Sequence, residues 1–363
     1  MSWYASWAAL AALTAVLSFA AVGLVLVFAR RRALFAIPEA RSSHTVPTPS
    51  GGGLGIVAAI FLSWTASFAY RSGSSALAAP TLAVPLLALA VLVATATGLA
   101  DDRHALRAKP KMLLIVGAAA LALPAATIHA VDLPWLGRVD FGLLAVPLSM
   151  FWLVGFTNAF NFMDGINGIS GTTLVVSGGA FAIAGAQHGD TDTLLSGTLL
   201  AGGALGFLPW NFPRAKIFMG DAGALPLGLL LAVTAVQASR DGRLGLPMSL
   251  PFPACVLLLG PYLFDVSLTL FRRWRQKKPL AQAHRDHLYQ RLARGLRSHA
   301  AATLAVGAVE MATAWLALTY GWRNDLGRAL SLLLPLIALL TLVPWISRRE
   351  SRASSSASDA PKG

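Results

Sequence analysis

Long apolar stretches separated by short polar segments run through this chain from end to end. Eleven of them approach or exceed the roughly 18 to 20 residues that a helix needs to cross a bilayer. They cover residues 5–28, 53–70, 80–100, 112–130, 141–157, 169–186, 193–210, 222–238, 248–270, 300–320 and 327–346. The pattern predicts an all-α integral membrane protein, a polytopic bundle of eleven transmembrane helices.

The basic residues between these stretches set the expected orientation. Arg30, Arg31 and Arg32 follow the first stretch and no basic residue precedes it, which favours a retained helix over a cleaved signal peptide. If the helices alternate, the inner loops and the C-terminal tail carry 23 of the 29 Lys and Arg residues. This bias predicts an outer N-terminus and a cytoplasmic C-terminus.

The composition agrees with one membrane domain. Hydrophobic residues make up 56% of the chain and charged residues only 12%, about half the share in soluble domains. We expect a membrane domain over residues 1–350 and a disordered cytoplasmic tail over residues 351–363, which are rich in Ser and Ala. The net charge of +13 suits anionic lipid and an anionic substrate, so no nucleic acid is expected. The single cysteine, Cys255, excludes an intramolecular disulfide.

The acidic residues that have a motif around them fall on one predicted side of the membrane. They are Asp101, Asp102, Asp164, Asp221 and Asp286, all predicted cytoplasmic. Carboxylates near hydrocarbon are costly unless they are paired, hydrated or bound to metal. Their gathering at helix ends on one face therefore predicts a polar site there.

Asp101 and Asp102 end the third predicted helix. Two negative charges at the negative end of a helix dipole are poorly placed as plain caps. Adjacent carboxylates can raise each other's proton affinity or share a cation, which makes them candidates for base catalysis or metal positioning. The alternative is a solvated pair neutralised by Arg103 and Arg107.

Four polar residues at a spacing of three follow the fifth stretch: Asn158, Asn161, Asp164 and Asn167. On a helical turn they would line one face. Their oxygens suit a hard cation, and their amides suit a nucleotide. The alternative is a turn that merely ends the helix.

Two glycine-containing loops lie on the same predicted side. In residues 213–223, Lys216 supplies positive charge, Phe218 an aromatic face and Asp221 a carboxylate between glycines, so phosphate, base and Mg²⁺ could meet there. An ordinary loop entering a helix at its N-terminus is the alternative. The other loop, residues 43–53, is punctuated by prolines and opens onto three glycines, which signals only a turn with close backbone approach.

The last inner loop, residues 271–299, combines a basic run with His284, His287 and Arg291. If the segment is helical, the two histidines share a side, and the loop suits a polyanion. Two histidines alone are not a zinc site. A basic face on the membrane surface is the alternative.

Taken in order, five segments resemble the superfamily of polyprenyl-phosphate N-acetylhexosamine-1-phosphate transferases, glycosyltransferase family 4, which is related to phospho-N-acetylmuramoyl-pentapeptide transferase. The matching segments are Pro-Thr-Pro-Ser-Gly-Gly-Gly, Asp-Asp, Asn-Ala-Phe-Asn-Phe-Met-Asp-Gly, Phe-Met-Gly-Asp-Ala-Gly and His-Arg-Asp-His-Leu-Tyr-Gln-Arg. The last looks most like the bacterial branch that starts O-antigen or related glycans. Asn167 departs from the many bacterial members with a second Asp there, which puts its local role and the donor in question.

The resemblance implies a reaction at the cytoplasmic face of the bacterial inner membrane. A UDP-N-acetylsugar would give its sugar 1-phosphate to undecaprenyl phosphate and release UMP, with Mg²⁺, or Mn²⁺ in its place, on Asp221 and Asn161. Asp101 or Asp102 would be the base. The other implied site residues, catalytic or substrate-binding, are Lys111, Asn158, Asp164, Asn167, Lys216, Phe218, His284, His287 and Arg291.

The sequence leaves several alternatives open. The donor could be UDP-N-acetylglucosamine or a 6-deoxy form such as the N-acetylfucosamine or N-acetylquinovosamine derivative, and displacement could take one step or two. A homodimer is the default expectation. The competing function is a cation-coupled transporter, in which Asp265 and Glu310 would carry ions through the membrane.

Overall fold

The computed structural model of the chain describes residues 2–32, 35–36, 46–72, 82–240, 248–279 and 284–358. Its helices are α1 (Ser2–Arg31), α2 (Gly53–Ser72), α3 (Ala83–His104), α4 (Ala108–Ala122), α5 (Ala145–Met163), α6 (Ile169–His188), α7 (Thr191–Asn211), α8 (Asp221–Ala238), α9 (Phe252–Leu258), α10 (Gly260–Arg275), α11 (Leu288–Leu296), α12 (His299–Leu318) and α13 (Asp325–Ser358). Short 3₁₀ turns are η1 (Leu123–Ala125), η2 (Gly142–Leu144) and η4 (Tyr320–Trp322).

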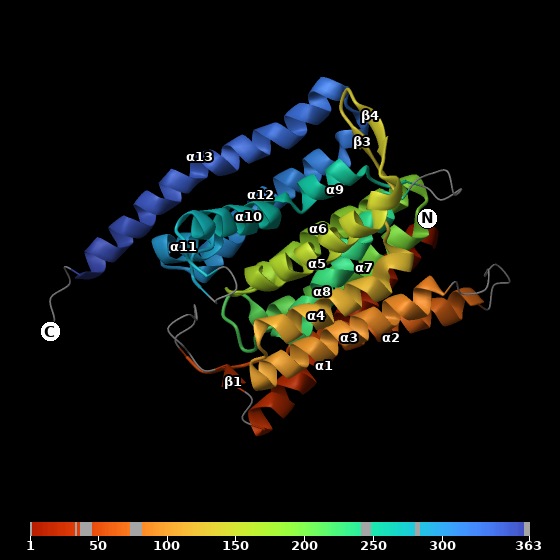
Figure 1. Cartoon of the computed structure of the whole chain (residues 1–363). Coiled ribbons are helices and arrows are strands. Elements are labelled where there is room, and N and C mark those ends of the chain that lie inside the picture. Colours follow the sequence, from red (N-terminus) through yellow and green to blue (C-terminus); the bar gives the residue numbers. More distant parts are fainter. Residues whose placement is uncertain are drawn as a thin grey trace.

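Most helices lie side by side with similar directions (Figure 1). Two short antiparallel pairs mark opposite ends: β1 (Phe35–Ala36) with β2 (Thr48–Pro49), and β3 (Ala130–Leu133) with β4 (Gly137–Asp140). β1, α11 and the C-terminus lie at one end, while the N-terminus and the β3–β4 hairpin lie at the other (Figure 1). We call these the β1 end and the hairpin end.

The expected helical membrane architecture is confirmed, and each expected stretch falls on a helix or a bent pair of helices. In the described part of the chain, nine helices are long and apolar enough to cross a membrane, and the pair α9–α10 makes ten if counted as one span. α2 would be the eleventh span, but its apolar part, Gly53–Ser67, is shorter than the other spans. Eleven spans and their orientation therefore stay a prediction.

The stretch expected at residues 248–270 is not one straight helix. α9 and α10 meet at an angle of 73°. The break lies at Leu259 and Gly260, directly before Pro261, whose ring lacks an N–H and disfavours a helical conformation in the preceding residue. At the C-terminus, α13 runs past Ser351 to Ser358, where a disordered tail was expected, and residues 359–363 lie outside the described part.

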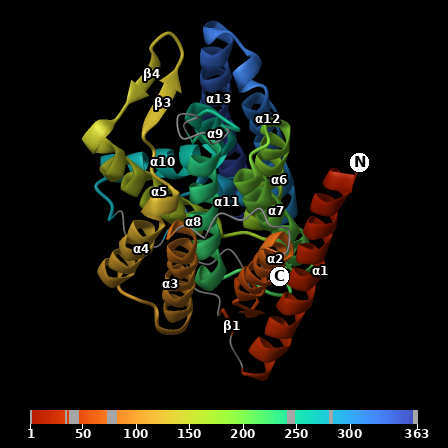
Figure 2. The same ribbon diagram turned by 90° about the vertical axis from the view of Figure 1, so that its right-hand side faces the viewer.

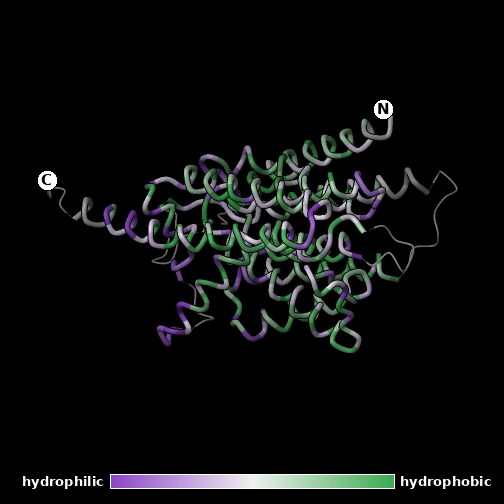
Figure 3. Tube along the Cα trace, turned by 90° about the horizontal axis from the view of Figure 1, so that it is seen from above, coloured by the Kyte–Doolittle hydropathy of each residue, from purple (hydrophilic) through white to green (hydrophobic). Residues whose placement is uncertain are grey.

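α8 forms the centre of the bundle. In its apolar window 89% of residues are buried, compared with 17% in α13 and 22% in α1. Figure 2 shows α8 surrounded by other helices, with α1 at the edge. Hydrophobic residues run along most helices, and hydrophilic ones gather near the C-terminal end of α13 (Figure 3). A helix apolar on all sides can be buried completely, which explains the position of α8.

Glycines bring α2 and α3 into backbone contact with α8. A Cβ on Gly53 would lie 2.2 Å from the Cα of Gly223, and one on Gly98 would lie 2.1 Å from the carbonyl oxygen of Asp221. No side chain fits at these distances. The first turn of α8 is thereby held against the start of α2 and the last turns of α3.

We expect Gly98→Ala to push α3 away from α8 and to destabilise the protein by about 1–3 kcal/mol, the usual cost of overpacking. Gly117 on α4 is the matched control, because a Cβ there meets nothing within 4 Å. Gly117→Ala should be neutral or stabilising by about 0.5–1 kcal/mol. Thermal unfolding of the purified proteins in detergent measures both, and equal melting temperatures for the two variants would contradict the close contact.

Candidate active site

Asp102 links the end of α3 to the beginning of α8. Its two carboxylate oxygens accept hydrogen bonds from the backbone N–H groups of Asp221 (2.9 Å) and Ala222 (3.0 Å). The first N–H groups of a helix have no partner within the helix and carry partial positive charge. The carboxylate that is unfavourable at the C-terminus of its own helix is therefore stabilised by the N-terminus of another.

Lys111, in the first turn of α4, joins the two remaining carboxylates of this cluster. Its Nζ donates to Oδ2 of Asp101 at 2.7 Å and makes a short contact with Oδ2 of Asp221. Asp101 also accepts from the N–H of Leu106 at 2.7 Å. Three carboxylates and one ammonium leave a formal charge of −2, which favours binding of a cation.

The described part of the proline–glycine loop packs against the start of α8. Pro49 accepts from the N–H of Phe218, while Gly52 and Gly53 donate to Phe218 and Met219, at 2.8–2.9 Å. Gly220 has a positive φ of 74°, and a Cβ on it would lie 2.7 Å from Oδ2 of Asp102. Glycine is therefore required at this position. The two glycine-containing loops are therefore joined by backbone hydrogen bonds. Residues 43–45 of the proline–glycine loop lie outside the described part.

The end of α5 divides the row of four polar residues, so that Asn158 and Asn161 lie within the helix and Asp164 and Asn167 beyond it. Asn158 donates to the carbonyl of Val154 at 2.8 Å, and Asn161, one turn on, has a buried Nδ2 with no hydrogen-bond partner among the described residues. Such an orphaned amide suits a bound ligand. Asp164 caps the C-terminus of α5.

The carboxyl group of Asp164 interacts electrostatically with the carboxylate cluster. Burial, with a smaller contribution from the negative charges of Asp221 and Asp102, raises the pKa of Asp164 from 3.8 to about 7. Asp164 therefore shares one electrostatic site with the cluster and keeps its proton to a higher pH than a solvated aspartate does.

Asn167 does not join this group, because α5 ends at Met163 and the chain turns away. Its Nδ2 donates to the carbonyl of Pro213 at 3.2 Å, and its Oδ1 lies 3.4 Å from Nδ1 of His299. The predicted single face thus holds only up to Asp164. Asn167 instead ties the α5–α6 loop to the α7–α8 loop and to α12.

Lys216 also lies away from the carboxylates. This exposed side chain places its Nζ 5.3 Å from the centre of the Trp210 ring, a cation–π contact. Trp210 in turn stacks on Phe19 of α1, with ring centres 4.8 Å apart. Phe218 is half-buried and fixed through its backbone to the proline–glycine loop.

The histidine loop is built on Asp265 of α10. This buried carboxylate accepts from the N–H groups of Leu288 and Tyr289 at 2.9 Å, which caps α11, and lies 3.0 Å from Nδ1 of His287. A carboxylate at Nδ1 selects the tautomer with a proton there and leaves Nε2 as an acceptor. Asp265 thus anchors the histidine loop to α10.

His284 stacks on His287 with ring centres 4.9 Å apart. Partial burial, together with the nearby His287 and Arg273, lowers the pKa of His284 to about 4. The imidazole is therefore neutral at physiological pH and offers hydrogen bonds, not positive charge, to a phosphate. Asp286, whose pKa is lowered by its ion pair with Arg273 despite some burial, holds the loop to α10.

Arg291 contacts α13 and not the carboxylate cluster. Its Nε donates to Glu350 at 2.8 Å, and Glu350 also accepts from Arg294 at 2.6 Å. Beside this contact lies a basic cavity of about 240 Å³ lined by Arg285, Gln290, Ala293, Arg294, Arg297, Ser298 and His299. The basic cavity has no acidic lining residue and therefore suits an anion.

Several residues of this region were not predicted as site residues: Ser50, Ser170, Arg273, His299 and Glu350. Ser50 had a local signal in the proline–glycine loop, and Arg273 had one in the basic run. Ser170, His299 and Glu350 had none, and the partners of Glu350 and His299 lie 59 and 132 residues away in sequence.

Comparison with known proteins finds a family and several relatives. The sequence model of the family "Glycosyl transferase family 4" matches residues 84–239 of this chain. Decaprenyl-phosphate N-acetylglucosaminephosphotransferase of Mycobacterium leprae is 31% identical over 376 residues, covering 94% of this chain and 92% of the relative. The chain belongs to glycosyl transferase family 4. In this family 4 transferase, the segment that matches the family model extends from α3 to the end of α8. It includes Asp101, Asp102, Lys111, Asp164 and Asp221.

Two further relatives carry different names. A probable undecaprenyl-phosphate N-acetylglucosaminyl 1-phosphate transferase of Bacillus subtilis is 28% identical, with 74% of this chain and 72% of the relative covered. A phospho-N-acetylmuramoyl-pentapeptide-transferase of Leuconostoc citreum is 32% identical, with 65% and 75% covered. The predicted superfamily is thus confirmed, and this family 4 transferase is a multi-pass membrane protein.

Asp164→Asn should change how the stability of this transferase depends on pH. Between about pH 4 and 7 the folded carboxyl keeps a proton that the unfolded chain releases, so wild type loses stability as the pH rises through this window. Asn has no charge to bury, so the variant should gain about 1 kcal/mol over wild type at pH 8, a value discounted for partial exposure, and little at pH 5. Thermal unfolding of metal-free and substrate-free protein at both pH values tests this, and equal gains would contradict it.

Asp265→Asn should destabilise the family 4 transferase by about 1–3 kcal/mol, because one amide oxygen cannot accept all the bonds that the buried carboxylate accepts. Asp325→Asn, at an exposed site on α13, is the control and should change stability by less than about 0.5 kcal/mol. Melting temperatures in detergent give both values. A fully stable Asp265→Asn protein would show that α11 does not depend on this cap.

Proposed function

We propose that this protein transfers an N-acetylhexosamine 1-phosphate from a UDP-sugar to undecaprenyl phosphate and releases UMP, at the cytoplasmic face of the bacterial inner membrane. The observation that carries the proposal is the convergence of Asp101, Asp102, Asp221 and Lys111 where the membrane helices α3 and α8 meet. One substrate is a long hydrocarbon and the other a soluble nucleotide, so the reaction requires a polar site at such a boundary.

The donor that we place first is UDP-N-acetylglucosamine. The Mycobacterium leprae and Bacillus subtilis relatives, which cover most of the chain, carry N-acetylglucosamine in their names, whereas the N-acetylmuramoyl-pentapeptide relative covers less. The 6-deoxy donors, N-acetylfucosamine and N-acetylquinovosamine, are the alternatives. The product would begin a cell-surface glycan such as an O-antigen.

Asp221 and Asn161 would hold Mg²⁺, or Mn²⁺, which would stabilise the charge that develops on the pyrophosphate. The excess of negative charge in the cluster fits this ion. The buried Nδ2 of Asn161, which has no hydrogen-bond partner among the described residues, is a donor and suits a phosphate oxygen of the UDP-sugar. No group of three His, Cys, Asp or Glu residues in the described ranges could hold a metal. Mg²⁺ commonly completes its shell with substrate phosphates and water, so a bound pyrophosphate would supply the missing oxygens.

Lys111 provides the positive charge closest to the cluster. Its ammonium group is held between Asp101 and Asp221, where it can donate to a phosphate oxygen. The basic cavity beside α11 offers a second anchor for a phosphate group. His287, with Nδ1 fixed by Asp265, can accept a hydrogen bond at Nε2.

The bonding of Asp101 and Asp102 favours direct displacement. Every carboxylate oxygen of the two already accepts a hydrogen bond, which makes a poor nucleophile. A lipid phosphate oxygen would attack the sugar-linked phosphorus, and the bond to UMP would break. Asp164, with a pKa of about 7, would accept a proton from the fraction of lipid phosphate that is still a monoanion.

UMP release from a panel of UDP-N-acetylsugars, with undecaprenyl phosphate and Mg²⁺ in detergent, tests the proposal. Asp221→Asn should lower the rate by about 10²–10³, the usual loss when a group that stabilises transition-state charge is removed. Asp140→Asn, on the exposed hairpin strand β4, should leave the rate unchanged. No release from any donor by folded protein, beside an active control enzyme, would refute the transferase function.

A further inference from the structure

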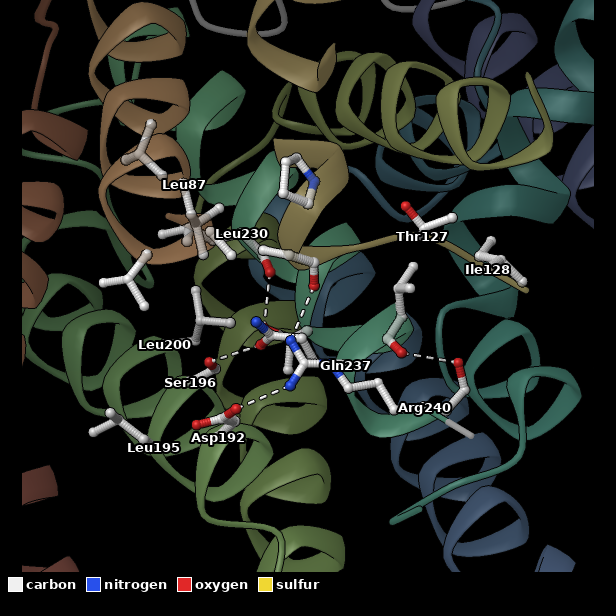
Figure 4. A pocket seen from close by; sticks show the side chains of 18 of the residues that line it. Leu87, Thr127, Ile128, Asp192, Leu195, Ser196, Leu200, Leu230, Gln237 and Arg240 are labelled. Atoms are coloured by element: carbon white, nitrogen blue, oxygen red, sulfur yellow. Dashed lines mark hydrogen bonds and ion pairs between the residues drawn. The ribbon is translucent and has the colours of Figure 1, made fainter. Parts of the chain in front are cut away.

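A second large cavity lies far from the carboxylate cluster, towards the hairpin end. It has a volume of about 620 Å³, within the usual range for a small-molecule site, and lies among α2, α3, α7 and α8 (Figure 4). From Asp101 to Ala88 on α3 is about 20 Å, and from Asp221 to Gln237 on α8 is about 24 Å, at 1.5 Å per helical residue. We call it the hairpin-end cavity, and it does not belong to the active site.

The wall of the hairpin-end cavity that lies between the helices is apolar. Figure 4 shows four leucine side chains of this apolar wall, those of Leu87, Leu195, Leu200 and Leu230. Further apolar side chains of this wall include Ile60, Phe61, Trp64, Val84, Ala88, Val91, Leu199 and Val236. All of these belong to helices that cross the membrane, or to α2, so the space suits a hydrocarbon chain.

The rim of the hairpin-end cavity is polar and carries charges of both signs. Nη1 of Arg240 donates to Asp192 at 2.9 Å, and its Nη2 donates to the carbonyl of Ala125 at 3.1 Å. Ser196 donates to Gln237 at 3.3 Å (Figure 4). The remaining ionisable residues of the lining are Asp132, Arg138 and His129.

The charges decide which kind of amphipathic molecule fits. The lining holds two arginines, Arg138 and Arg240, and two aspartates, Asp132 and Asp192, so the formal charges of these four side chains sum to zero. Sites for anionic lipids are basic clusters. A balanced rim complements a head group that carries both a phosphate and an ammonium.

We propose that the hairpin-end cavity binds one zwitterionic phospholipid, of the phosphatidylethanolamine class. One of its two acyl chains lies between α2, α3, α7 and α8, its phosphate meets Arg240, and its ammonium meets the aspartates of the rim. The lipid fills space between α3 and α8, the helices that carry the carboxylate cluster at their other ends. The inference does not rest on the transferase reaction.

Native mass spectrometry of the detergent-purified full-length protein tests this, with phosphatidylethanolamine, phosphatidylglycerol or undecaprenyl phosphate added in turn. Wild type should retain one phosphatidylethanolamine and about fivefold less phosphatidylglycerol, a difference of about 1 kcal/mol. Ala88→Trp places an indole in the cavity and should lower phosphatidylethanolamine retention about tenfold. Leu89→Trp, on the exposed face one residue on, is the matched control and should retain lipid as wild type does.

Arg240→Gln keeps the cavity open and removes the phosphate partner, so it should lower phosphatidylethanolamine retention even if Ala88→Trp does not fold. Equal retention of both phospholipids by wild type, or unchanged retention in Arg240→Gln, would overturn the proposal. Displacement of phosphatidylethanolamine by undecaprenyl phosphate in wild type would also overturn it and would assign the cavity to the acceptor chain. UMP release measured on the same samples shows separately whether the transferase function holds.

Discussion

The contact between Asp102 and the N-terminus of α8 is the constraint on which the rest of the candidate site depends. Two N–H groups at the beginning of α8 and two oxygens at the end of α3 satisfy each other. Both helices can therefore end together at the boundary of the membrane, where unpaired polar groups are costly. The same contact places Asp221 next to Lys111 and Asp101, so structural and chemical needs are met by one arrangement.

Backbone proximity makes this contact possible. Gly53, Gly98 and Gly223 let three helices approach without side chains between them, and Gly220 lets the chain turn beside Asp102. Asp265 repeats the principle in the histidine loop, where a carboxylate from α10 caps α11. In both places a carboxylate of one helix accepts hydrogen bonds from the N-terminus of another helix. The polar loop that leads into the second helix is held in place by these bonds.

Much of the fold could be predicted because apolar runs of membrane-spanning length are unambiguous, and each run falls on a helix or on the bent α9–α10 pair. The bend between α9 and α10 was not predicted. It lies directly before Pro261, and a hydropathy pattern does not show the effect of a proline on the helix. Asp101, Asp102, Lys111 and Asp221 were predicted as site residues and lie together. Asn167, Lys216 and Arg291 were predicted with them but contact other partners, because spacing along the chain does not tell which segments meet in space.

The sequence by itself determined that the chain is a helical membrane protein with acidic motifs of a sugar-phosphate transferase family, since membrane insertion and motif order are local properties. Only the tertiary structure decided which charges meet. The pairing of Lys111 with Asp221, of His287 with Asp265 and of Arg291 with Glu350 joins segments that are far apart in sequence. Electrostatic and hydrogen-bond energies depend on distances in space, and those exist only once the helices have packed.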